Sequence, residues 1–144
     1  MLTKSWLRVV DDMRGVFRAR GLVDGLGWGE AVISNSPISF LEGVDPEQGK
    51  IIDKSHELFG LSIDRKVLIF PHSVGSSVGA YVLYKLKKNE KAPSAIINLR
   101  SDNIVVSGCA IANIPLVDMV EGLSLIRKGD FLMVNGSNGS VIVY

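Results

Sequence analysis

The chain has 144 residues, of which 47% are hydrophobic and 22% are charged, a composition typical of one globular domain. Sixteen basic residues against fifteen acidic ones leave a formal net charge of +1. This balance gives no electrostatic attraction to nucleic acid or to an anionic membrane, so neither partner is expected.

The single cysteine limits the chemistry that this chain can carry alone. A lone thiol, Cys109, forms no internal disulfide and supplies neither a cysteine-rich zinc site nor an iron–sulfur site. We expect it to be a small buried apolar residue rather than a catalytic thiol. Any cluster chemistry would need cysteines from another chain.

No targeting or membrane-spanning segment is indicated. Charged residues interrupt the apolar stretches of residues 1–17, and no run reaches the about 20 apolar residues that cross a bilayer. A cytoplasmic protein is therefore expected. Residues 1–15 carry apolar side chains at helical spacing, so we expect a short helix or a loose extension before a domain of residues 16–144.

The first half of this domain has the pattern of strands and turns. Residues 16–23 alternate apolar and polar side chains, as a half-buried strand does, and residues 25–30 predict a turn. Two more short strands are predicted at 30–35 and 38–41. Residues 42–64 are polar and rich in turn formers, so we expect a surface loop near whatever the protein contacts.

The second half alternates strands and helices. We predict buried strands, helical segments and a final hairpin, in the order strand 66–70, helix 77–89, strand 94–99, a helical or irregular piece 106–114, strand 114–117 and hairpin 130–144. The fold class is therefore α/β. A parallel element is expected in the second half and antiparallel strands elsewhere.

The segment "PHSVGSSVGAY" lies between a predicted strand and a predicted helix. Gly75 allows a sharp turn, and Ser76 or Ser77 could cap the helix. The same geometry points backbone N–H groups at an anion, and the residues alone leave capping and anion binding equally open. The segment is neither a Walker motif nor a nucleophile elbow, because the residues that define those motifs are missing.

Neither histidine has the spacing of a metal-ligand pair. His56, next to Asp53 and Glu57, is expected at the surface rather than in catalysis. His72 stands one turn before the two serines, and its residue pattern leaves open whether it orients their loop or has no role.

Several segments in combination resemble the small subunits of the aconitase X family, over residues 16–144. They are "SFLEGVDPEQGKIID", "HELFG", "FPHSVGSSVGAYV", "KAPSAIIN" and "DNIVVSGCAIANIPLVD". The resemblance implies an aconitase-like swivelling β/β/α domain that ends in a C-terminal hairpin. It also implies a separate large subunit whose cysteines hold a 4Fe–4S cluster, with no cluster bound by this chain alone.

Within the family, the chain is most similar to an archaeal branch of heteromeric hydro-lyases. That branch is expected to dehydrate (R)-5-phosphomevalonate to trans-anhydromevalonate 5-phosphate in isoprenoid synthesis. By resemblance, Ser76 is the catalytic base, and Gly75 and Ser77 contact the substrate. Aconitase has an arginine after its two serines, whereas this chain has Val78, which disfavours a tricarboxylate substrate.

Three further residues are candidates for support of the serine loop, namely His72, Asp53 and His56. Two alternative functions also stay open. The chain could be the small subunit of a cis-3-hydroxy-L-proline dehydratase, although relatives of that kind resemble "GSCTG" rather than "GSSVG" in this loop. It could instead be a non-catalytic swivelling module that only holds an anion.

Overall fold

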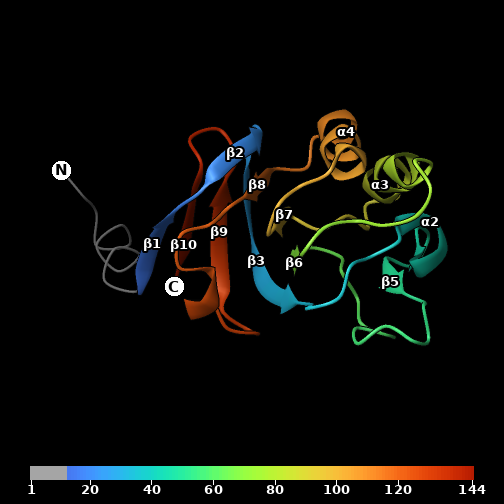
Figure 1. Cartoon of the computed structure of the whole chain (residues 1–144), viewed down its shortest axis with the longest axis horizontal. Helices are drawn as coiled ribbons and strands as arrows, with labels where there is room; N and C mark the ends of the chain where they lie inside the picture. The colour runs from blue at the N-terminus through green and yellow to red at the C-terminus, as the bar shows by residue number, and fades with distance from the viewer. Residues whose placement is uncertain (1–12) are drawn as a thin grey trace.

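The computed structural model describes residues 13–144 (Figure 1). Its strands are β1 (Gly15–Arg18), β2 (Arg20–Val23), β3 (Leu26–Ile33), β4 (Val44–Asp45), β5 (Lys50–Ile51), β6 (Val67–Phe70), β7 (Ala95–Asn98), β8 (Leu116–Asp118), β9 (Phe131–Asn135) and β10 (Ser140–Val143). Its helices are α2 (Phe40–Gly43), α3 (Gly79–Lys88), α4 (Asn103–Ala112) and the 3-10 turn η1 (Leu123–Leu125). The helix or extension expected for residues 1–15 falls almost wholly outside the described residues. Among residues 13–144, no helix has the length and apolar character needed to cross a membrane.

Eight strands form one sheet in the order β1-β10-β9-β3-β6-β7-β8-β2. Strands β3, β6, β7 and β8 run parallel, and the other pairings are antiparallel. Only Ala19 separates β1 from β2, yet these two strands stand at opposite ends of the order. The sheet therefore curls until its two ends meet.

The curled sheet and the helices make three layers, with antiparallel strands, parallel strands and helices in sequence across Figure 1. One core fills the space between the two strand layers and includes Ile69, Ile97 and Val141. The other core lies between the parallel strands and the helices and includes Leu68 and Leu86. The parallel strands are apolar on both faces because both faces are covered.

Most of the predicted elements are confirmed. The buried strands of the second half are β6, β7 and β8, and the expected hairpin is β9–β10. Residues 106–114 fall largely in α4, whose N-cap is Asp102 and whose C-cap, Asn113, has the left-handed φ of 56°. Residues 16–23 form β1 and β2 rather than a single strand.

Two predictions of the first half were wrong. Residues 26–30 form no turn, because they are the start of β3 and pair with β9. A Cβ on Gly27 would collide with the carbonyl of Ser94, so this glycine allows close backbone approach rather than a turn. Residues 38–41 form no strand either, since Ile38 makes one isolated bridge and Ser39 then caps the short helix α2.

Candidate functional site

The loops that follow the parallel strands meet at the carboxyl edge of the sheet, joined by backbone hydrogen bonds. The N–H of Ser34, after β3, donates to Ile69 O at 2.8 Å. The N–H of Leu99, after β7, donates to Pro71 O at 3.1 Å. Ligands of α/β sheets commonly bind at this edge, which makes these loops the candidate site.

Residues 71–78, called the serine loop below, connect β6 to α3. Gly75, Ser76 and Ser77 are all exposed, and Gly75 adopts the left-handed φ of 91°. Within residues 13–144, the N–H groups of these three residues donate to no acceptor. Three consecutive N–H groups beside the start of a helix form a favourable environment for an anion.

Neither serine is the N-cap of α3. That position belongs to Val78, which makes no side-chain capping bond. Ser76 Oγ accepts a hydrogen bond of 3.2 Å from the N–H of Val78, and its carbonyl accepts one of 3.0 Å from Gly79. Ser76 therefore tightens the turn before the helix, while its hydroxyl stays accessible. The Ser77 side chain has no hydrogen-bond partner among the described residues.

The start of the serine loop is fixed at Ser73, which is buried although its neighbours are exposed. Both its N–H and its hydroxyl donate to the carboxylate of Asp102, each at 2.7 Å. Asp102 also accepts hydrogen bonds from Ile104 and Val105 at the start of α4. Burial raises the pKa of Asp102, but the hydrogen bonds from Ser73, Val105 and Ile104 together lower it by more. The pKa of Asp102 therefore lies below its ordinary value.

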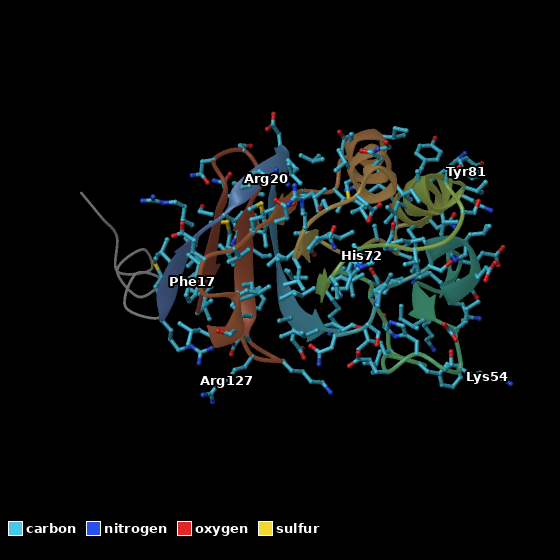
Figure 2. All side chains as sticks on the ribbon, in the orientation of Figure 1. Phe17, Arg20, Lys54, His72, Tyr81 and Arg127 are labelled. Atoms are coloured by element: carbon cyan, nitrogen blue, oxygen red, sulfur yellow. The ribbon has the colours of Figure 1, made fainter. Side chains whose placement is uncertain are left out.

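His72 lies between β6 and the helical layer in Figure 2, at the base of the serine loop. Its Nδ1 is 2.9 Å from the carbonyl oxygen of Ser73, so Nδ1 carries the proton in this contact. Among the described residues, no hydrogen bond joins His72 to Ser76 or Ser77. His72 is exposed, and its hydrogen bond goes to Ser73 at the base of the loop.

Asp53 and His56 lie on a different segment. Asp53 accepts hydrogen bonds from the N–H and hydroxyl of Ser55, which closes a surface turn and lowers the pKa of Asp53. His56 accepts from the N–H of Leu58 through Nδ1, and its Nε2 lies 3.1 Å from the carbonyl of Pro37. His56 thus joins the long loop to the segment before Ile38. It does not reach the serine loop directly.

The buried polar residues under this edge were not predicted from the sequence. Asp118 forms a bidentate pair with Arg20, at 2.8 and 2.6 Å, and accepts the N–H of Ser101. Asn98 donates to the carbonyl of Phe70. These bonds tie the ends of β6, β7 and β8 to each other. The only sequence signal nearby was the "SDN" triplet of residues 101–103, in which Asp102 has the pattern of a helix N-cap for α4.

A cavity of about 400 Å³ also lies at this edge, between the ends of β3 and β6 and the turn η1. Its lining is mostly apolar: Ile33, Ser34, Asn35, Ile69, Phe70, Pro71, Leu99, Leu123, Ser124 and Ile126. Only Pro71 of the serine loop lines it, and neither Ser76 nor Ser77 does, so the cavity and the two serines are not one site.

The described residues do not fit an iron–sulfur cluster or another metal. Within residues 13–144 there is no group of three or more His, Cys, Asp or Glu residues able to hold a metal ion. Cys109 is fully buried, and that burial raises the pKa of its thiol far above the ordinary range. Residues 13–144 therefore offer no ligand set for a cluster.

A family model for the aconitase X swivel domain matches residues 16–143. The chain belongs to the aconitase X swivel domain family. The resemblance noted from the sequence is therefore confirmed, together with the expected α/β swivelling fold.

Close relatives and solved structures agree with this assignment. The phosphomevalonate dehydratase small subunit of Methanosarcina mazei is 50% identical over 127 residues, 87% of this chain and 88% of that protein. The protein of the same name from Thermococcus kodakarensis is 44% identical over 124 residues, 86% of this chain and 92% of that one.

Two solved structures share the fold. The holo-form crystal structure of Thermococcus kodakaraensis aconitase X matches with a TM-score of 0.86 and 42% identity, covering 90% of this chain and 98% of that one. A solution structure of a UPF0107 protein matches with a TM-score of 0.81 and 38% identity, covering 90% of this chain and 99% of that one.

Proposed function

We propose that this chain is the small subunit of a heteromeric hydro-lyase that dehydrates (R)-5-phosphomevalonate to trans-anhydromevalonate 5-phosphate. The observation that supports this most strongly is the set of relatives at 41–50% identity that carry the name phosphomevalonate dehydratase small subunit. The reaction would serve isoprenoid synthesis in the cytoplasm. The swivelling domain of residues 16–144 would act only in complex with a large subunit.

Ser76 is the base in this proposal. Its hydroxyl lies on an exposed loop, and its Oγ already accepts the N–H of Val78, a contact that would stabilise negative charge on the oxygen. Ser76, as its alkoxide, would take the proton from the carbon next to the substrate carboxylate, and the C–H electron pair would form the new double bond as the C–O bond of the neighbouring carbon breaks. The departing hydroxide would take a proton from solvent and leave as water. The exposed N–H groups of Gly75 and Ser77 would hold an anionic group of the substrate.

The large subunit would provide what this chain lacks. Its cysteines would bind a 4Fe–4S cluster, which when bound supplies a Lewis acid. Val78 has no charge with which to hold a carboxylate, so a cation of the large subunit or the N–H groups of residues 75–77 would anchor the phosphate. Splitting the base and the Lewis acid between two chains makes activity depend on assembly.

Co-expression with the cysteine-bearing large subunit tests this function. The purified complex should dehydrate (R)-5-phosphomevalonate, and neither chain alone should do so. Turnover of cis-3-hydroxy-L-proline in place of the phosphate substrate would overturn the substrate assignment. A complex that binds anions without any turnover of either compound would overturn the enzymatic role.

A further inference from the structure

Ser73 is held on two opposite sides, three residues before Ser76. On one side, Ile38 donates its N–H to His72 O at 3.3 Å and accepts the N–H of Val74 at 3.1 Å. On the other side, the Asp102 carboxylate accepts both the N–H and the hydroxyl of Ser73. The backbone of residues 72–74 is therefore fixed before it enters the exposed part of the loop.

The Asp102 carboxylate is the meeting point of two elements. One oxygen accepts the Ser73 hydroxyl and the N–H groups of Ile104 and Val105, and the other accepts the Ser73 N–H. The same side chain thus begins α4 and anchors the serine loop. The serine loop continues into α3, and α4 packs against α3. Both ends of the loop are therefore attached to the same pair of packed helices.

Only Val74 and Gly75 separate this anchor from Ser76. Gly75 adopts the left-handed φ of 91°, with Ser39 Oγ 2.8 Å from the position that a Cβ would take. After the serine, the carbonyl of Ser76 accepts the N–H of Gly79. A shift of Ser73 would therefore be transmitted to the Ser76 hydroxyl, and a misplacement of about 1 Å can cost about 10²-fold in rate.

We propose that Asp102 is a positioning residue, which holds Ser73 so that the Ser76 hydroxyl stands in its reactive place. This rests on the proposed function, in which Ser76 is the base. Asp102 itself is 29 residues along the chain from Ser73 and touches the loop's base rather than Ser76.

Three substitutions separate positioning from helix capping. Asp102→Ser keeps a good N-cap for α4, but its side chain is too short to reach Ser73. Asp102→Ala removes both contacts. Ser73→Ala removes only the hydroxyl and leaves Asp102 to cap α4. A positioning role predicts that Asp102→Ser restores the helix-capping part of the melting temperature lost in Asp102→Ala but does not restore kcat.

In the assembled enzyme, Asp102→Ser and Ser73→Ala should each lower kcat by about 10-fold, with KM changed by less than about threefold. The double variant should be no slower than the worse single variant, because both substitutions break the same contact between Ser73 and Asp102. Unchanged kcat in Asp102→Ser, with only thermal stability altered in Asp102→Ala, would overturn the proposal.

Hydrogen exchange of the full chain gives a second readout that needs no enzymatic activity. In Asp102→Ser, the amide of Val74 should exchange at least about 10-fold faster, whereas the Cys109 amide inside α4 should keep its rate. An unchanged Val74 rate would overturn the positioning role. If the wild-type complex does not dehydrate phosphomevalonate, the proposed function fails while the exchange result still decides whether Asp102 fixes the loop.

Discussion

The hydroxyl of Ser39 lies directly against Gly75. A Cβ built on Gly75 would come within 2.8 Å of Ser39 Oγ, and Gly75 has the left-handed φ of 91°. Both the backbone conformation and the available space therefore favour glycine at this position. The contact also joins the serine loop to α2, because Ser39 is the N-cap of that helix.

Gly75→Ala should distort the serine loop. The left-handed conformation costs a residue with a Cβ about 1–2 kcal/mol, and the contact with Ser39 adds to this. We expect kcat to fall by at least about 10-fold, because Ser76 follows directly. Gly60→Ala is the matched control, since Gly60 has a φ of 83° but nothing lies within 4 Å of its Cβ position. Equal activity in both variants, measured in the complex, would contradict this role of Gly75.

His56 is expected to contribute to stability rather than to the reaction. His56→Ala removes the contacts with Leu58, Pro37 and Ser34, which should cost about 1–2 kcal/mol in urea unfolding. Asp53→Ala, in a surface turn of the same segment, should change stability by less than about 0.5 kcal/mol. Both variants should keep kcat within about twofold. A collapse of kcat in His56→Ala would instead assign His56 to the site.

Acid should weaken the contact between Asp118 and Arg20. Burial raises the pKa of Asp118, but hydrogen bonds from Arg20 and Ser101 lower it more, so the folded pKa lies below the ordinary value. The contribution of this contact to the free energy of unfolding is present above the unfolded pKa of about 3.9. It is lost as the pH falls through the lower folded pKa.

Asp118→Asn should therefore be about 1–3 kcal/mol less stable than the wild type at pH 7. This difference should shrink as the pH falls below about 4, because the Asp118 carboxyl of the unfolded wild type is protonated there while the folded one is protonated only at a lower pH. Urea unfolding at several pH values measures the difference. A difference that stays constant down to pH about 2 would show that Asp118 is not the titrating group.

Cys109 should be unreactive in the folded chain. Burial raises the pKa of the Cys109 thiol, so a thiol reagent should react with the folded chain at least about 10³-fold more slowly than with the chain unfolded in urea. The rate in the folded chain should be set by local unfolding around Cys109. The unfolded thiol ionises near pH 8.5 while the folded one stays neutral, so stability should fall as the pH rises above about 9. Cys109→Ala should remove this part of the alkaline decline. Fast labelling of the native chain would contradict the buried assignment.

Much of the fold could be predicted because buried strands are visible in the sequence as runs of apolar residues. The apolar runs of β6 and β7 and the turn between β9 and β10 were predicted, since they depend on neighbouring residues. The start of β3 was missed because Gly27 has a role only in relation to Ser94, a residue far along the chain. The closure of the sheet through β1 and β2 depends on pairing partners that no local pattern reveals.

The site was predictable only in part for the same reason. Gly75, Ser76 and Ser77 are adjacent in the chain, so their loop was recognisable as a unit. Asp102 joins that loop from 29 residues away and was not predicted, because its only local signal is a helix-capping pattern. Asp53 and His56 were considered as supports of the serine loop, but their hydrogen bonds lie within their own segment and at Ser34 and Pro37.

Replacement of Ser76 in the assembled enzyme is the most direct test of the central claim. Ser76→Ala should leave folding and pairing with the large subunit intact, because the side chain is exposed and makes one hydrogen bond, with Val78. Dehydration of (R)-5-phosphomevalonate should fall by at least about 10²-fold, the lower range for loss of a general base. Ser77→Ala, the neighbouring control, should raise KM more than it lowers kcat. Near-normal turnover by a purified Ser76→Ala complex would contradict the assignment of Ser76 as the base.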